Sequence, residues 1–184
     1  MFRAQHHRRN RASLVPAFTL IEILTVVVIL GICGAIIVPQ LGGREDLRTA
    51  SAARQVMADL IYAQNRAIST QQKHYVQFNG NTYTLSTRAD DSAALATITH
   101  PITKNPYVQA LAVAGTPLEF VTIQSANFAG QVSMGFDEFG APFSFDPASN
   151  TMTAMAAIGT IKLTSGTYSM TISVEPYTGD VNSQ

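Results

Sequence analysis

From Phe18 to Val38 the chain carries one charged side chain, Glu22, in a mostly apolar run that Pro39 closes. These 21 residues match the length that an α-helix needs to cross a hydrocarbon core of about 30 Å. Basic residues beside such a run stay on the cytoplasmic side of the membrane. The pattern predicts one membrane-spanning helix with its amino terminus in the cytoplasm, because four arginines precede it: Arg3, Arg8, Arg9 and Arg11.

Three other kinds of apolar segment fit this run less well. A cleaved secretory signal has a shorter apolar region of about 7–15 residues. A lipoprotein signal would use Cys33, but Ile32 stands where a small residue is required. A plain membrane anchor has the right length but leaves Glu22 unexplained, since a carboxylate costs roughly 2.5–3.5 kcal/mol at the centre of a spanning helix and less near its ends.

A second helical pattern follows between residues 47 and 68, where apolar and small residues recur at steps of three and four. Glu45 and Asp46 suit the positive end of a helix, and Gly42-Gly43 marks a weak point between the two helical halves. We expect the stripe to pack on the chain's own sheet. It comprises Leu47, Ala50, Ala53, Met57, Leu60, Gln64, Ala67 and Ile68, flanked by Val56 and Ile61.

The period changes to two from His74, which is typical of β-strands, and Asn79-Gly80-Asn81 is a strong hairpin signal. Residues 87–106 are polar and are predicted to form a long loop. The pattern as a whole predicts an α+β fold, with one long amino-terminal helix packed on an antiparallel β-rich domain. Further strands are predicted at Leu118–Ile123, Val132–Phe136, Phe143–Phe145, Thr160–Leu163 and Tyr168–Val174.

Charge is distributed unevenly along the 184 residues, although the formal net charge is zero. Four of the twelve Lys and Arg residues lie before the apolar run, so eight remain in the rest of the chain against twelve Asp and Glu. Nucleic-acid binding is therefore unexpected, because it usually requires a basic face. Cys33 is the single cysteine, which excludes an intrachain disulfide.

No catalytic motif stands out, and we expect neither an enzyme nor a bound cofactor. His6 and His7 precede the apolar run, while His74 and His100 are isolated in sequence, and Cys33 is interpreted as a small apolar packing residue. Asp90-Asp91 and Asp137-Glu138 lack calcium-ligand spacing, so we interpret them as solvated loop charge and expect no metal. The aromatic residues Phe136, Phe139, Phe143 and Phe145 are predicted to pack in the core or in turns.

The segment Ala17-Phe18-Thr19-Leu20-Ile21-Glu22 resembles the processing site of type IV prepilins and type II secretion pseudopilins. In that family a basic leader is cut before the phenylalanine, and the new amino group is methylated. The resemblance implies cleavage between Ala17 and Phe18 with methylation of Phe18. It also gives Glu22 a partner, because a buried carboxylate is tolerable beside a cation and the freed amino group of Phe18 is the nearest candidate.

Two further positions bear on this resemblance. Pro39 falls where the family commonly places a helix-bending proline, so Glu22 and Pro39 are the implied assembly residues. The family prefers glycine before the cut, and this chain has Ala17 instead. Alanine is small enough to fit, and we expect slower processing.

Three later stretches resemble the GspH/FimT-like branch of the family. QVMADLIYAQNRAIS, from Gln55 to Ser69, is similar to its helix, and MGFDEFGAPFSF is similar to its F-x-x-x-G segment, carried by Phe136 and Gly140. ISVEPYTGDV is similar to the closing strand, carried by Ile172 and Val174, and to its T-G turn, carried by Thr178 and Gly179. This resemblance implies a minor pseudopilin of a type II secretion system, or alternatively a FimT-like minor pilin of a type IV pilus.

The implied organisation is a leader at 1–17, a membrane half of the helix at 18–39, a periplasmic half at 40–72 and a β-rich domain at 73–184. The implied location is the inner membrane, crossed once, with the carboxyl-terminal domain in the periplasm. The implied partners are a prepilin peptidase that also methylates, major and other minor pseudopilins, and an inner-membrane assembly platform. DNA uptake is disfavoured, because no Lys or Arg follows Lys162.

Overall fold

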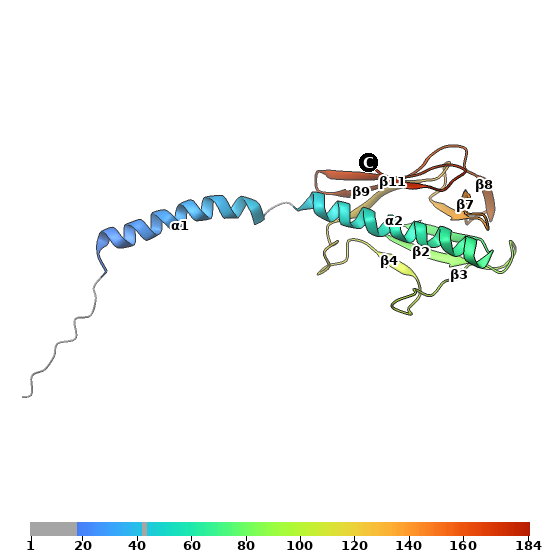
Figure 1. The fold of residues 1–184 in the computed structure, drawn as a ribbon, viewed down its shortest axis with the longest axis horizontal. Helices are drawn as coiled ribbons and strands as arrows, with labels where there is room; N and C mark the ends of the chain where they lie inside the picture. The colour runs from blue at the N-terminus through green and yellow to red at the C-terminus, as the bar shows by residue number, and fades with distance from the viewer. Residues whose placement is uncertain (1–17, 42–43) are drawn as a thin grey trace, which may run out of the picture. The chain divides into compact units, whose positions relative to one another are not determined.

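The chain divides into two compact units, Met1–Gly43 and Arg44–Gln184, and the computed structural model describes residues 18–41 and 44–184 (Figure 1). The first unit contributes helix α1 (Leu20–Leu41). The second contributes helix α2 (Glu45–Thr70) and the strands. The single long helix predicted from the sequence is therefore described as two helices, and the predicted weak point at Gly42-Gly43 lies outside the described residues.

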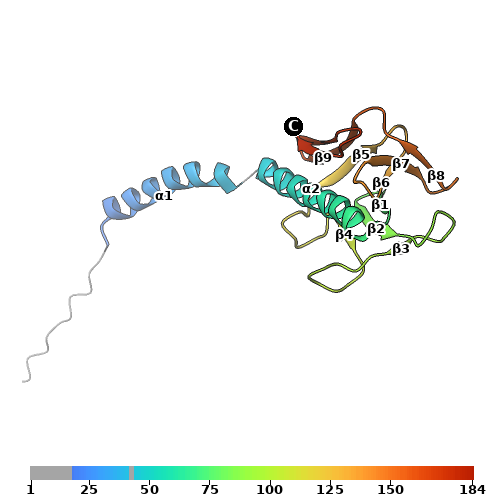
Figure 2. The same cartoon turned by 45° about the vertical axis from the view of Figure 1, so that its right-hand side comes forward.

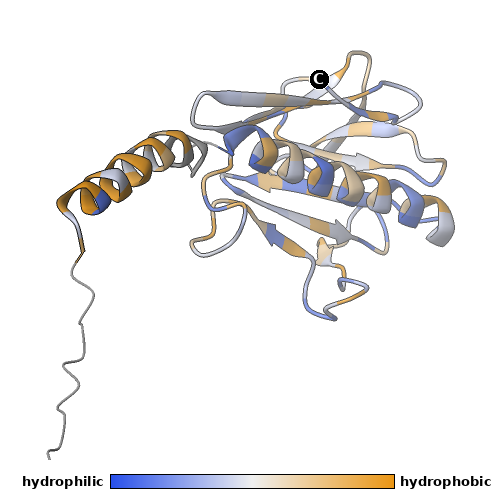
Figure 3. Cartoon of the chain, turned by 60° about the vertical axis from the view of Figure 1, so that its left-hand side comes forward, coloured by the Kyte–Doolittle hydropathy of each residue, from blue (hydrophilic) through white to orange (hydrophobic). Residues whose placement is uncertain are grey.

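Helix α1 begins at Leu20 because Thr19 caps it. The backbone N–H of Glu22 donates to the Thr19 carbonyl at 3.1 Å and to its Oγ1 at 3.2 Å. The helix continues through Pro39 to Leu41, and Figure 3 shows apolar residues around most of its surface. In the part of the chain that the structure describes, no helix meets the length and apolarity required of a membrane span.

Helix α2 begins at Glu45, where Glu45 and Asp46 meet the positive end of the helix as predicted. It ends at Thr70 because Gln71 takes a left-handed conformation (φ 52°), which stops helical hydrogen bonding. Between these ends apolar and polar residues recur in turn along the helix (Figure 3).

The strands of the second unit form two antiparallel sheets. The larger sheet has the order β3-β2-β1-β6-β7-β8, with β4 also pairing with β2, and the smaller has the order β11-β10-β9-β5. The larger sheet comprises β1 (His74–Asn79), β2 (Thr82–Thr87), β3 (Ala96–Thr97), β4 (Val108–Ala110), β6 (Ser133–Phe136), β7 (Pro142–Asp146) and β8 (Thr151–Ala154). The smaller comprises β5 (Thr122–Asn127), β9 (Gly159–Ser165), β10 (Tyr168–Val174) and β11 (Val181–Ser183).

The core of the unit forms where α2 meets both sheets (Figure 2). The helix contacts β1 and β6 of the larger sheet and β9, β10 and β11 of the smaller one. One apolar cluster joins Leu60 of α2, Phe136 of β6 and Ile161 of β9, and each of these side chains is at most 1% exposed. An antiparallel β-rich domain covered by a helix is the α+β fold predicted from the sequence.

The prediction of which residues of α2 face the core was partly wrong. Ala53, Leu60 and Ala67 are buried as predicted, but Leu47 is 61% exposed and Ile68 is 43% exposed. The buried face is instead rich in alanine, since the helix lies close to two sheets and small side chains permit that approach. Its buried members are Thr49, Ala52, Ala53, Val56, Asp59, Leu60, Ala63 and Ala67.

The predicted hairpin is confirmed, because β1 and β2 pair antiparallel around Gly80, whose φ is +58°. The strand predicted at Leu118–Ile123 lies further along the chain, because β5 begins only at Thr122. The predicted loop at 87–106 contains the short strand β3. Strands β3, β4, β8 and β11 were missed because each spans two to four mostly exposed residues, which gives no alternation of buried apolar positions.

Two isoleucines provide a test of this core: Ile161 within β9 and Ile158 just before it. We expect Ile161→Ala to lower the free energy of unfolding by about 2–5 kcal/mol, because Ile161 is fully buried and its removal leaves a cavity. The matched control Ile158→Ala should cost less than about 0.5 kcal/mol, because Ile158 is 51% exposed. Urea unfolding followed by tyrosine fluorescence measures both, since the chain has no tryptophan. Equal losses would contradict this packing.

Candidate functional site

The start of α1 holds two of the residues singled out from the sequence. Phe18 is 75% exposed, Glu22 lies in the first turn of the helix, and Pro39 lies near its other end. Ala17 lies outside the described residues, as do His6 and His7. Phe18 and Glu22 therefore lie at the same end of one helix, about one turn apart along the chain.

Glu22 also occupies the third helical position after the capping residue Thr19. A threonine followed three residues later by glutamate is the spacing of a capping box, of which only the Thr19 half is formed here. The charge of an acidic side chain in this turn still stabilises the positive end of the helix. This role was missed in the sequence interpretation, although the T-x-x-E spacing could have indicated it. The carboxylate of Glu22 has no hydrogen-bond or ion-pair partner among the described residues, so it is available to a group outside them.

A buried carboxylate that the sequence analysis missed lies at the middle of α2. Asp59 accepts hydrogen bonds from the Tyr83 hydroxyl at 2.5 Å and from the Tyr107 hydroxyl at 2.9 Å. These bonds connect the helix to β2 and to the residue before β4. Burial raises the pKa of Asp59, and the two hydroxyl donors and nearby His100 oppose that rise. Both tyrosine pKa values are raised, by burial first and by the Asp59 charge second.

We expect this carboxylate to make stability depend on pH. Between the ordinary pKa of 3.8 and the raised value in the folded chain, the folded state binds more protons than the unfolded state. The contribution of Asp59 to stability therefore falls as pH rises through this window. Asp59→Asn removes the titration, so the unfolding free energy of the wild type minus that of the variant should decrease with pH. Urea unfolding at a series of pH values checks this, and a constant difference would contradict it.

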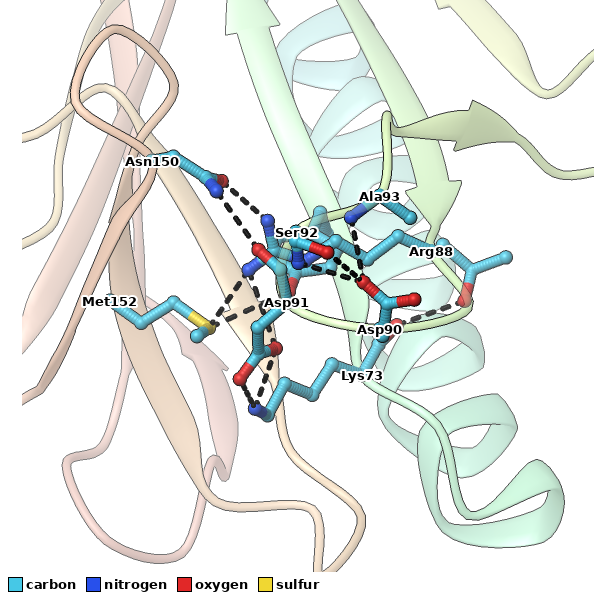
Figure 4. Close-up of polar contacts among 10 residues, drawn as sticks. Lys73, Arg88, Asp90, Asp91, Ser92, Ala93, Asn150 and Met152 are labelled. Atoms are coloured by element: carbon cyan, nitrogen blue, oxygen red, sulfur yellow. Dashed lines mark hydrogen bonds and ion pairs between the residues drawn. The ribbon is translucent and has the colours of Figure 1, made fainter.

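A second polar cluster surrounds Arg88, which follows β2 and has a side chain only 2% exposed (Figure 4). Its guanidinium donates to the Asn150 side chain and, at 3.4 Å, to Asp91. It also lies 4.8 Å from the ring centre of Tyr75 and 5.6 Å from that of Phe145. Lys73 pairs with the same Asp91 at 2.9 Å. The cluster thus connects residues after β2 to the turn between β7 and β8.

A small hollow of about 70 Å³ lies beside this cluster, lined by Lys73, Arg88, Asp91 and Glu138 among other polar residues. Nε of Arg88 is buried without a hydrogen-bond partner in the part of the chain that the structure describes. The volume and the polar lining suit an ordered water. The hollow holds no arrangement of a nucleophile and a base, so we interpret the cluster as a structural clamp.

Alanine substitutions of Arg88 and Lys73 distinguish the buried cation of the cluster from the solvent-accessible one. Arg88→Ala is expected to lower the free energy of unfolding by about 2 kcal/mol or more, because it removes a buried stem and its aromatic contacts. Lys73→Ala is the matched control and should cost less than about 1 kcal/mol, because its ion pair with Asp91 is solvent-accessible. Thermal unfolding of both variants measures the difference. A larger loss in Lys73→Ala would be inconsistent with the clamp.

The other candidate residues do not converge on one site. His74 is buried on β1, where burial lowers its pKa, and its Nδ1 lies 2.9 Å from the Gln72 carbonyl. His100 lies against Tyr107, with ring centres 4.5 Å apart. Asp90 and Asp137 accept backbone N–H groups of their own turns. In the described ranges, no group of three or more His, Cys, Asp or Glu residues could hold a metal ion.

The structure brings together all three stretches that carry the body resemblance. Gln64 of α2 donates from Nε2 to the Gly140 carbonyl and to the Thr178 carbonyl, both at 2.9 Å. A Cβ on Gly179 would come 2.6 Å from that same Nε2 and 2.9 Å from the Gly140 carbonyl. The two glycine turns and the helix therefore meet at one amide group. Phe136, Phe143 and Phe145 are buried as predicted, whereas Phe139 is 85% exposed.

Comparison with known proteins gives one family and one solved structure. The family model described as type II transport protein GspH matches residues 52–179. The crystal structure of the type IV minor pilin FimU from Pseudomonas aeruginosa is similar at 16% sequence identity and a TM-score of 0.44. That match covers 74% of this chain and 87% of the pilin chain. No curated protein matches the chain.

Proposed function

The chain belongs to the GspH family of type II transport proteins, and from this premise we propose that it is a minor pseudopilin of a type II secretion system. The observation that carries the proposal is the family match over residues 52–179, which covers most of the globular unit. The family consists of pilin-like structural subunits and is not an enzyme family. Its members are expected to contact other pilins or pseudopilins.

The proposed route of assembly begins at the amino end of α1. A prepilin peptidase removes residues 1–17, and the freed amino group of Phe18 is methylated. The Glu22 carboxylate then attracts that amino group on a neighbouring subunit. Two facts support this route: the sequence around Ala17 and Phe18, and a Glu22 carboxylate without a partner among the described residues. The attraction between two charges in apolar surroundings is not screened by solvent, and a buried carboxylate left without its cation is strongly destabilised.

The proposed location is the inner membrane, with residues 18–39 crossing it once and the globular unit in the periplasm. The sequence from Phe18 to Val38 supports this placement, because it carries one charged residue in 21. All residues from Phe18 to Ile36 are exposed except Gly34, which is half-buried. An apolar helix of this kind requires lipid or other helices around it. An inner-membrane assembly platform and an external ATPase would supply the force, since the sequence contains no phosphate-binding loop.

Three variants of the full chain test the assembly step. Glu22→Ala and Glu22→Gln are expected to lower incorporation into sheared filaments by about tenfold or more, because each removes the charge that attracts the Phe18 amino group. Thr19→Ala is the control: it removes the capping oxygen and leaves the Glu22 charge, so it should incorporate almost normally. Quantitative immunoblots of the filament fraction measure all three.

Intact mass of each variant should show loss of residues 1–17 and gain of one methyl group, which establishes equal processing. If Thr19→Ala lowers incorporation as much as Glu22→Ala, then Glu22 acts through the helix start and the proposed pairing is wrong. Deletion of the gene decides between the two filament types. Loss of protein secretion supports the pseudopilin, whereas loss of surface pili supports the alternative, a FimT-like minor pilin of a type IV pilus.

A further inference from the structure

A histidine side chain helps to close the turn between β3 and β4. Nδ1 of His100 accepts the backbone N–H groups of Ile102 and Thr103, both at 3.2 Å. The His100 carbonyl also accepts from the Lys104 N–H at 3.1 Å, and the His100 N–H donates to the Asn105 carbonyl at 2.8 Å. Two backbone bonds and one ring nitrogen therefore hold this turn, in which Ile102 is 83% exposed.

Other turns of this chain use a carboxylate in the same position. Oδ1 of Asp90 accepts the N–H groups of the residues two and three positions further on, which is the pattern formed by His100. Oδ1 of Asp137 and Oδ1 of Asp146 each accept the N–H two positions further on. A carboxylate or amide oxygen is the ordinary acceptor in such turns, and it remains an acceptor at neutral and mildly acidic pH. Histidine is different, because its charge ordinarily changes between pH 5 and 8.

The two bonds to Nδ1 require one form of the imidazole ring. A ring nitrogen accepts a hydrogen bond only while it carries no proton, so the ring of His100 is neutral here, with its proton on Nε2. A proton on Nδ1 would turn this acceptor into a donor that faces two other donors. The turn would then lose both bonds, and the N–H groups of Ile102 and Thr103 would bond to water.

The surroundings of His100 favour the protonated ring. The ring centre of His100 lies 4.5 Å from that of Tyr107, and an aromatic ring attracts a cation. The Tyr107 hydroxyl donates to Asp59, whose charge attracts that of His100 while the carboxylate is ionised. Lys104, in the turn itself, carries the opposing positive charge. The other titratable groups beside this network are Tyr62 of α2, which stacks on Tyr107, and Tyr83 of β2, which donates to Asp59.

We propose that His100 is a pH-sensitive latch on the turn between β3 and β4. At neutral pH its Nδ1 holds the N–H groups of Ile102 and Thr103, and the turn is closed. In mild acid the imidazolium releases these groups and is retained by the Tyr107 ring, and the turn opens. Ile102 has a fixed position only in the closed turn, so a contact that depends on this exposed side chain weakens in acid.

The latch is independent of the proposed assembly step. It involves residues 98–107 and their neighbours in α2 and β2, and none of residues 18–22. It can fail while the pairing of Glu22 holds, and the reverse is equally true. It is also distinct from the titration of Asp59, because the proton is gained by His100 and the bonds that break lie in the turn.

The state of the ring is measured by nitrogen-15 NMR of the full chain, labelled at histidine and held in detergent micelles. At pH 7.5 we expect the His100 ring to carry a proton on Nε2 and none on Nδ1, and at pH 5 both nitrogens should be protonated. His100→Asn assigns the signals, because the chain has three other histidines. A proton on Nδ1 of the neutral ring at pH 7.5 would overturn the proposal, as would a ring that stays neutral at pH 5.

Hydrogen exchange of the Ile102 and Thr103 amides in the same protein measures the turn. Their protection, relative to the intrinsic exchange rate at each pH, should fall about three- to tenfold between pH 7.5 and pH 5 in the wild type. His100→Asn is the matched control, because its Oδ1 accepts in the same position and does not titrate, so its protection should be equal at both pH values. Constant protection in the wild type contradicts the latch, and so does an equal fall in His100→Asn. Unchanged amide signals from β9 and β10 verify that both proteins are folded.

Discussion

The close packing of α2 against two separate sheets is the interaction on which the globular unit depends. The sheets share no strand, so the helix is the element that brings them into one core. The buried alanines at positions 52, 53, 63 and 67 make this possible, because small side chains let a helix approach strands on two sides. Leu60 then fills the remaining space, together with Phe136 of the larger sheet and Ile161 of the smaller one.

Polar contacts along α2 fix the position of the helix against the two sheets. Asp59 is buried, and both of its oxygens accept tyrosine hydroxyls. Gln64, about a turn further along, donates both amide protons to turns of different sheets. A buried polar group such as the Asp59 carboxylate costs free energy unless it is fully bonded, so it defines one arrangement of the helix and its neighbours, and the half-buried Gln64 adds two directional bonds to the same arrangement. These bonds fix the position of α2 along the two sheets, which its alanine-rich face alone would not define.

The functional residues divide between the two units. Phe18 and Glu22 lie at the start of α1, in an exposed apolar helix whose start Thr19 caps. The globular unit has no catalytic arrangement among its described residues, and large apolar side chains such as Phe120, Phe139 and Tyr177 are exposed on its surface. A structural subunit of a pilin-like family requires exposed surfaces of this kind, because its work is to contact neighbours.

The sequence alone determined the features that depend on local pattern. The apolar run that became α1, the start of α2 at two acidic residues, the hairpin at Gly80 and strands β6, β7, β9 and β10 all follow from periodicity and turn chemistry over a few residues. The glycine turns and the family resemblance were likewise visible in short motifs. Only the tertiary structure decided which face of α2 is buried, that Asp59 lies among tyrosines, and that Gln64, Gly140 and Gly179 meet. Those facts depend on contacts between residues separated by up to 114 positions, and no local period encodes such contacts.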